Sequence, residues 1–361
     1  MRVIRAAFGP GEVRIAVVED GQLMDLAIWR PGAPDGLGDI HVGRIIARVP
    51  AMAGAFMALA GAEGFLPDSD GAAQHGEGDM ITVRITRTAQ GGKGPRLSAT
   101  PEPAPAGPPR LLRRGASPLA RLAAAYPGAD ILVDDPALLS AEPGRTRLVA
   151  HAFDDELEAE IESLAATQAD LPGGLRATIT PTPALTAIDL DMAGATASRA
   201  EKTAAQLAGN RAALPALARQ IRLRNLGGAI LIDFAGIPIK RRAALAPALE
   251  AALATDPVRP RLLGFSHLGL AEILRPRGTA PLHELLHGPL AAGLAALRRI
   301  ARELPNRPGW RPVLRAAPAV VAALQADPVA LPDLARRATY PLILTSDPAL
   351  PIDRWAIEDA T

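Results

Sequence analysis

Hydrophobic and polar residues alternate along the first part of the chain, a pattern typical of half-buried β-strands. Residues 2–8, 12–19 and 23–29 alternate in this way, with a Gly-Pro-Gly and an Asp-Gly turn between them, which predicts a β-meander. Further short strand-like segments lie between Gly-rich breaks in residues 38–98. About five such strands in so short a stretch predict a small barrel.

Beyond the Pro-rich segment 101–109, which we expect to be a linker, the pattern becomes a mixture of helices and strands. An Ala-rich helical region is expected at 199–225, and Pro215 inside it should kink or split the helix. Residues 281–303 predict another helix. The other helices expected from 118 onward lie at 118–126, 154–168 and 239–254, and strands are expected at 129–135, 146–153 and 227–234. Residues 175–191 predict two strands joined at Pro183, and residues 259–276 predict two more. A strand, a helix and a closing segment are expected within 310–359.

Composition narrows the protein class. The length of 361 residues allows about two or three domains. There is no cysteine, which excludes disulfides and thiolate metal sites, and the net charge of +1 says little about partners. The N-terminal residues lack the apolar core of a signal peptide, and no uncharged run reaches the roughly 18–20 residues of a membrane span. We therefore expect a cytoplasmic protein with no membrane span.

Two aspartates stand at the ends of predicted buried strands. Asp189 follows the apolar segment LTAI, and Asp233 follows AILI. Neighbouring strands of one sheet would bring the two carboxylates together, and a divalent cation such as Mg²⁺ or Mn²⁺ would relieve their repulsion. Each aspartate could instead cap the helix or turn that follows it.

The predicted barrel carries a second set of residues. Phe56 and Phe65 are two of the six phenylalanines in the chain, and Lys93 lies on a Gly-rich tip. Aromatic rings and a cation on a small barrel are typical of surfaces that bind single-stranded nucleic acid. Both rings could instead belong to the barrel core.

The segment 283–287 reads His-Glu-Leu-Leu-His, the zinc-binding pattern of many metalloproteases. That chemistry needs one helix carrying both histidines and a third ligand. Gly288 and Pro289 follow at once and should end the helix, so a protease is disfavoured.

Taken together, these segments resemble the ribonuclease E/G endoribonucleases over nearly the whole chain. GDIHVGRIIARVPAMAGAFMALAGAEGFLP resembles the start of that family's S1-type RNA-binding domain, and LTAIDLD followed by ARQIRLRNLGGAILIDF resembles its catalytic subdomain. The resemblance implies that Asp189 and Asp233 bind a catalytic Mg²⁺, with Mn²⁺ as a possible substitute, and that Phe56, Phe65 and Lys93 grip RNA.

The resemblance also implies an α+β multidomain fold. An S1-type OB barrel (38–100) would be inserted into an RNase H-like unit (1–37 plus 110–172). A DNase I-like α/β catalytic subdomain (173–280) and a small α/β C-terminal domain (281–361) would follow. The implied activity is metal-dependent hydrolysis of single-stranded RNA that leaves 5′-phosphate and 3′-hydroxyl ends.

Departures from the family pattern leave an alternative open. Asp191 stands where the family usually has Asn, and could add a metal ligand or weaken the orientation of the phosphate. The family's 5′-monophosphate sensor and its cysteine zinc link between protomers are missing. A catalytically weakened or inactive RNA-binding protein is therefore the alternative to an enzyme. A homodimer without the zinc link is possible, and a structural zinc on His283 and His287 is disfavoured.

Several arginines are candidate phosphate contacts. Arg222 and Arg224 lie in the run ARQIRLRNLGG, and Lys240, Arg241 and Arg242 form a basic run after the strand of Asp233. The alternative is that these residues form an ordinary solvated helix face.

Overall fold

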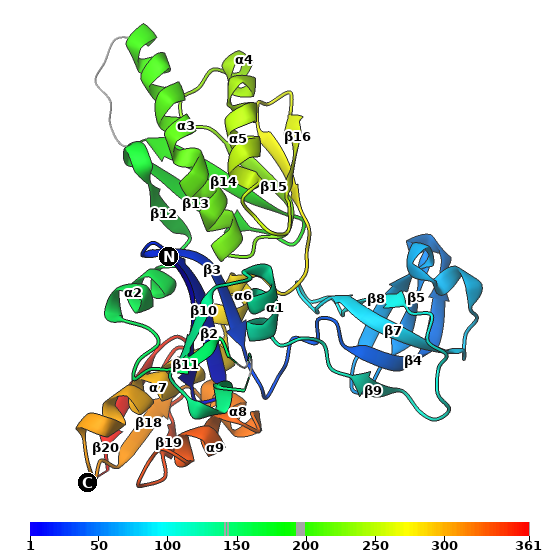
Figure 1. The fold of residues 1–361 in the computed structure, drawn as a ribbon, viewed down its shortest axis with the longest axis vertical. Helices are drawn as coiled ribbons and strands as arrows, with labels where there is room; N and C mark the ends of the chain where they lie inside the picture. Colours follow the sequence, from blue (N-terminus) through cyan, green and yellow to red (C-terminus); the bar gives the residue numbers. More distant parts are fainter. Residues whose placement is uncertain (141, 143, 193–198, 361) are drawn as a thin grey trace. The chain divides into compact units, whose positions relative to one another are not determined.

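The computed structural model describes residues 1–140, 142, 144–192 and 199–360, with the backbone only for 199–204. The chain divides into two compact units (Figure 1). The first unit combines residues 1–154 with 283–361, and the second unit is residues 155–282. Among the described residues, no helix combines the length and the apolarity needed to cross a membrane.

The first unit begins with the expected meander. Strands β1 (Arg2–Gly9), β2 (Glu12–Glu19) and β3 (Gln22–Trp29) pair antiparallel. The same sheet is continued by β10 (Asp130–Val133), parallel to β1, and then by β11 (Thr146–Leu148). Helix α1 (Pro118–Ala125) packs its buried leucines against this sheet. The strands between β3 and β10 form a separate barrel, so the chain leaves this sheet and later returns to it.

The barrel expected between residues 38 and 100 is present. Its strands are β4 (Ile40–Val49), β5 (Gly54–Ala58), β6 (Glu63–Pro67), β7 (Met80–Arg87) and β8 (Arg96–Ala99). The order β4-β5-β6-β8-β7 returns to β4, so the sheet closes on itself, and β9 (Arg110–Arg113) adds to β4. The described backbone of 101–109 is neither helix nor strand.

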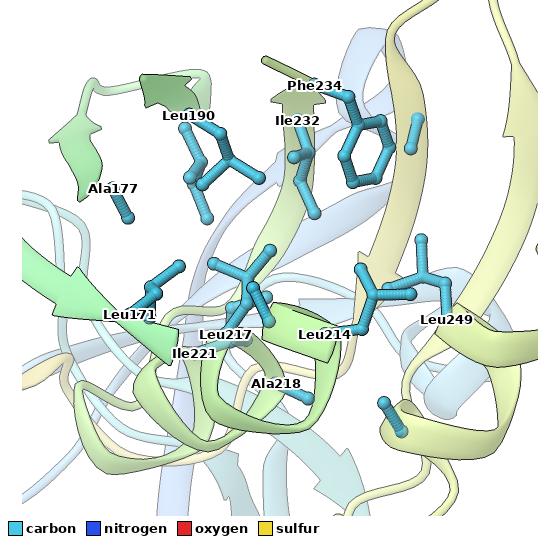
Figure 2. Packing of buried hydrophobic residues seen from close by; sticks show 14 of the residues in the cluster. Leu171, Ala177, Leu190, Leu214, Leu217, Ala218, Ile221, Ile232, Phe234 and Leu249 are labelled. Atoms are coloured by element: carbon cyan, nitrogen blue, oxygen red, sulfur yellow. The ribbon is translucent and has the colours of Figure 1, made fainter. Parts of the chain in front are cut away.

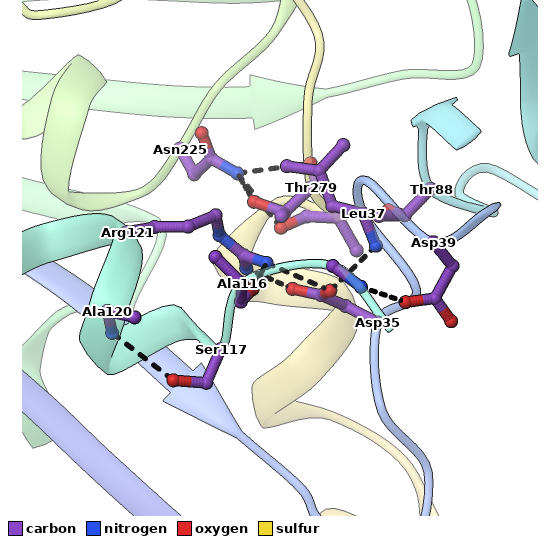
Figure 3. Close-up of polar contacts among 12 residues, drawn as sticks. Asp35, Leu37, Asp39, Thr88, Ala116, Ser117, Ala120, Arg121, Asn225 and Thr279 are labelled. Atoms are coloured by element: carbon purple, nitrogen blue, oxygen red, sulfur yellow. Dashed lines mark hydrogen bonds and ion pairs between the residues drawn. The ribbon is translucent and has the colours of Figure 1, made fainter. Parts of the chain in front are cut away.

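Polar contacts hold the two chain crossings between the barrel and the meander sheet (Figure 3). Asp35 before the barrel is paired with Arg121 after it. Asp39 accepts hydrogen bonds from Arg114 Nη1 at 2.6 Å and from the backbone N–H of Gly115 at 2.7 Å. These contacts join residues before the barrel to residues after it, at the two places where the chain enters and leaves the barrel.

The C-terminal part of the first unit is a small α/β arrangement. The helix expected over 281–303 is interrupted at Gly288, which has a φ of 94°, and becomes α6 (Leu282–Leu286) and α7 (Pro289–Glu303). Strands β18 (Pro312–Ala316), β19 (Ile343–Ser346) and β20 (Trp355–Asp359) form a sheet in the order β19-β18-β20. Helices α8 (Pro318–Ala326) and α9 (Ala330–Ala335) complete it.

The second unit is a mixed sheet with helices packed on it. Its strand order is β12-β13-β14-β15-β17-β16. Strand β12 pairs with β13, so the second unit includes residues before position 172, where the sequence suggested the boundary. The bounds are α2 (Asp155–Ser163), β12 (Gln168–Leu171), β13 (Leu175–Pro181), β14 (Leu185–Met192), α3 (Arg199–Leu223), β15 (Gly228–Asp233), α4 (Ile239–Arg242), α5 (Ala246–Leu253), β16 (Arg261–Phe265) and β17 (Ala271–Arg275).

Within the residues that the structure describes, helices pack on one face of this sheet and not on the other. Leu214, Leu217 and Ile221 of α3 pack with Leu249 of α5 against Ile232 and its neighbours (Figure 2). The helix α3 runs through Pro215, so the expected split there was wrong. Burial of Leu214 and Leu217 on either side outweighs the hydrogen bond that proline removes.

Candidate metal centre and RNA-binding surface

Asp189 and Asp233 are direct neighbours in the second unit. Strands β14 and β15 are parallel, and Asp189 is the register partner of Asp233. On β14, Ile188 and Leu190 are buried against the helices while Asp189 is exposed. Asp233 alternates in the same way with buried Ile232 and Phe234. Both carboxylates therefore lie on the sheet face that the helices do not cover, which we call the exposed face.

Asp191 lies on the same face, two residues beyond Asp189 on β14. Its register partner on β13 is Arg176, whose Nε donates to Asp170 Oδ1 at 2.9 Å. The three aspartates thus share one exposed face. Whether Asp191 adds a metal ligand stays a prediction, since within the described residues no three His, Asp or Glu side chains meet at one point.

The electrostatics of the pair favour a cation. The pKa of Asp189 is raised by partial burial and then by the negative charges of Asp191 and Asp233. Carboxylate oxygens that repel one another are the acceptor-only ligands that Mg²⁺ prefers. Because Mg²⁺ keeps several waters and is bound through one or two carboxylates, the residues present fit such an ion.

Arg242 is the cationic residue at this centre. Its Nη1 donates to Asp233 Oδ1 at 2.5 Å. The same side chain is fixed by the carbonyls of Ile237 (2.9 Å) and Gly269 (3.1 Å). The basic run after β15 therefore separates into two parts, because Lys240 and Arg241 are exposed while the Arg242 side chain is only 12% exposed. Three consecutive basic residues in the sequence do not indicate this difference in exposure.

Arg222 and Arg224 are both buried. Arg222 Nη1 donates to the carbonyl of Thr255 at 3.0 Å. Arg224 Nη1 donates to the carbonyls of Leu164 and Ala166, and burial lowers its pKa. Through these hydrogen bonds both arginines connect the end of α3 to neighbouring segments of the second unit. That Arg222 and Arg224 contact RNA stays a prediction, and the burial of both side chains disfavours it.

Phe56 and Phe65 lie on the outside of the barrel. Each is half-buried and alternates with fully buried neighbours, such as Met57 and Leu66. They are register partners on β5 and β6, and their ring centroids are 5.5 Å apart in an edge-to-face arrangement. The alternative that the two rings form the barrel core is therefore wrong.

The outward row continues beyond the rings. Arg96 of β8 is the register partner of Phe65, and Arg87 of β7 is the register partner of Arg96. Arg96 is held by Asp70, at 2.9 Å from Nη2. Lys93 is exposed on the β7–β8 turn, where its backbone pairs with Gln90. The sequence analysis missed Arg87 and Arg96. The alternation of Arg96 with buried Leu97 was visible, whereas the outward position of Arg87 follows from a register shift after Ile85 that the sequence does not indicate.

The His-Glu-Leu-Leu-His segment lacks the geometry that a metalloprotease needs. Helix α6 ends at Leu286, so His287 lies beyond it. His287 Nδ1 contacts the carbonyl of His283 at 2.7 Å. Glu284 would be the general base of a metalloprotease, but its two carboxylate oxygens accept hydrogen bonds from the backbone N–H of Gly91 at 3.0 and 3.1 Å. The match to the protease pattern is therefore accidental.

Comparison with known proteins identifies relatives of the second unit. The model of the ribonuclease E/G family matches residues 145–278. Ribonuclease E of Escherichia coli (strain K12) is 37% identical over 147 residues, which are 40% of this chain and 14% of that protein. Ribonuclease E of Synechocystis sp. (strain PCC 6803) is 36% identical over 157 residues, or 43% and 23% of the two chains. Ribonuclease G of Escherichia coli (strain K12) is 35% identical over 132 residues, or 36% and 27%.

The aligned part therefore spans only a small share of each of these relatives. The residues that the family model matches include Asp189, Asp233 and Arg242. The barrel with Phe56 and Phe65 lies outside the residues that the family model matches.

Proposed function

The chain belongs to the ribonuclease E/G family through residues 145–278, and from this premise we propose that it is an endoribonuclease acting on single-stranded RNA. The observation that carries the proposal is the parallel register of Asp189 and Asp233 on the exposed face. Two neighbouring carboxylates repel each other and also repel the phosphates of RNA. A protein that only bound RNA would have no need of them.

We assign the divalent cation to Asp189 and Asp233, with Mg²⁺ as the ion and Mn²⁺ able to replace it. Bound there, such a cation supplies stabilisation of the charge on the attacked phosphate and lowers the pKa of a water. The two strands fix the spacing of the Asp189 and Asp233 backbones, because the two residues are register partners of the β14–β15 ladder. Asp191 is an additional candidate ligand on the same face.

The barrel supplies RNA binding in this proposal. Phe56 and Phe65 offer adjacent rings on which unpaired bases can stack, and Lys93 offers an exposed ammonium to the backbone. Stacking requires bases that are free of a duplex, so the substrate is single-stranded. The products carry a 5′-phosphate and a 3′-hydroxyl. Action in the cytoplasm, and a homodimer formed without a cysteine zinc link, are further parts of the proposal.

Cleavage of a defined RNA tests this function. The full chain is incubated with a 5′-labelled unstructured RNA in Mg²⁺, with matched reactions in EDTA and on single-stranded DNA of the same sequence. We expect internal cleavage of the RNA in Mg²⁺ alone. On a 3′-labelled copy with a 5′-hydroxyl end, a 5′-phosphate-dependent exonuclease should degrade the labelled downstream product and leave the intact RNA. Binding of the RNA without cleavage in any divalent cation would instead identify an RNA-binding protein of the same fold.

A further inference from the structure

Arg242 is held in a way that an ordinary surface arginine is not. Its Nε and Nη1 donate to the carbonyls of Ile237 and Gly269, and Nη1 also reaches Asp233 Oδ1 at 2.5 Å. The arginine side chain is 12% exposed, whereas that of Asp233 is 49% exposed. The guanidinium is thus anchored in the protein, and the carboxylate that it touches faces solvent.

The loop between β16 and β17 is shaped around this arginine. Gly269 has a φ of 81°, and a Cβ there would lie 3.1 Å from Arg242 Cδ. Glycine at this position lets the loop carbonyl approach the guanidinium without strain or collision. Three separate segments, the turn after β15, helix α4 and this loop, therefore combine to place one cation at the edge of the aspartate group.

Arg242 and a divalent cation would use the same carboxylate. A guanidinium on Asp233 neutralises the charge that the cation needs, and the two positive charges repel each other when both are near. With the cation bound, however, the three aspartates still leave the centre with a net negative charge, which would repel an RNA phosphate. A fixed guanidinium at the same edge removes that excess.

We propose that Arg242 is a phosphate-binding residue of the cleavage centre that occupies Asp233 until a divalent cation takes that oxygen, and that it then contacts the RNA phosphate. The inference rests on the proposed function and deepens it. It assigns to one arginine two opposed effects, since Arg242 weakens the binding of the cation in free protein and strengthens the binding of the phosphate at the transition state.

Mn²⁺ binding measured by electron paramagnetic resonance without RNA separates these effects from activity. Arg242→Met keeps the length of the stem and removes the charge, and we expect Mn²⁺ to bind about three- to tenfold more tightly. At saturating Mn²⁺ the same variant should cleave RNA roughly 10²–10³-fold more slowly, the usual loss when one charge-stabilising donor is removed. Arg242→Lys, which keeps the charge, should be intermediate in both measurements.

The matched control is Arg211→Met, which removes the same charge from an exposed arginine on α3. It should change neither measurement by more than about twofold. Circular dichroism confirms folding, and if Arg242→Met is unfolded the comparison rests on Arg242→Lys.

Two failures are distinguishable. If the natural protein binds Mn²⁺ no better than an Asp233→Asn variant, the metal centre of the proposed function is refuted. If Asp233→Asn abolishes Mn²⁺ binding while the Arg242 variants bind Mn²⁺ like the natural protein, or more weakly, only the role of Arg242 is overturned. Unchanged cleavage in folded Arg242→Met would overturn it as well.

Discussion

At the scale of single residues, Asp189 and Asp233 are unfavourable neighbours. Their register brings like charges together, and the pKa of Asp189 is raised first by partial burial and then by the charges of Asp191 and Asp233. Nothing in the fold of the sheet requires aspartate there, because Leu231 and Ala187 occupy the equivalent outward positions one pair earlier. Groups that lower the stability of free protein are typical of sites kept for binding or chemistry.

His41 in β4 provides a pH-dependent prediction at the same scale. Burial lowers its pKa, Arg114 acts in the same direction, and Asp39 opposes them. Below pH of about 6.5 the unfolded chain takes up a proton that the folded protein resists, so the free energy of unfolding should fall as pH decreases through that value. Chemical denaturation at pH 8 and at pH about 5.5 should show a smaller drop for His41→Gln than for the natural protein. Equal drops would contradict the assignment.

At the scale of elements, a chain of polar contacts connects several segments of the second unit. Arg275 ends β17, and its Nε donates to Asp256 Oδ2 at 2.7 Å, with both side chains 4% exposed. Arg275 Nη1 also reaches Asn225 Oδ1, and Asn225 donates in turn to Thr279 (Figure 3). This polar chain connects the end of α3 to the segments after α5 and β17. Its members are satisfied by one another, so they tolerate burial.

Removing one partner of that buried pair should be costly. Asp256→Ala leaves the Arg275 charge buried without its carboxylate, and we expect a loss of about 3–5 kcal/mol in the free energy of unfolding. Asp170→Ala breaks the Asp170–Arg176 pair, which has a similar distance of 2.9 Å but is exposed. That control should cost about 0–1 kcal/mol in the same denaturant titration. Equal losses would show that burial is not the deciding factor.

The elements also show what the sequence could and could not foretell. Alternation gave the meander and the barrel strands, and the strand–helix–strand succession correctly placed the two aspartates on neighbouring strands. Helix α3 was expected to kink or split at Pro215, and it does not split, because Leu214 and Leu217 on either side are packed in the core. Arg222, Arg224 and Arg242 each donate to a backbone carbonyl that is distant in sequence. A local sequence pattern does not indicate such contacts, so the burial of these side chains could not be predicted.

At the scale of the whole molecule, the proposal divides binding and chemistry between parts of the chain. The barrel of the first unit carries the aromatic pair, and the sheet of the second unit carries the aspartates. Since each part has its own hydrophobic core, a change in one should leave the fold of the other intact. Affinity for RNA and affinity for the cation should therefore vary independently.

The aromatic pair tests this division. Phe56→Ala and Phe65→Ala should each weaken binding of a short single-stranded RNA by about 1–3 kcal/mol, the contribution of one stacked base. Fluorescence anisotropy in EDTA measures the affinity, and Mn²⁺ binding should remain unchanged. Leu112→Ala, which shortens another exposed apolar side chain on β9, serves as the control and should leave RNA affinity unaltered. A similar loss in all three variants would argue against a stacking surface.

The most direct test of the account is the rate at which a 5′-labelled single-stranded RNA is cleaved in Mg²⁺ by the natural protein and by the double variant Asp189→Asn, Asp233→Asn. The substitutions preserve side-chain shape while removing both charges that would hold the cation. We predict cleavage by the natural protein and a loss of at least about 10³-fold in the variant, since the loss of one charge-stabilising group alone costs about 10²–10³-fold. Equal rates for the two proteins would contradict the assignment of the cleavage centre to these aspartates.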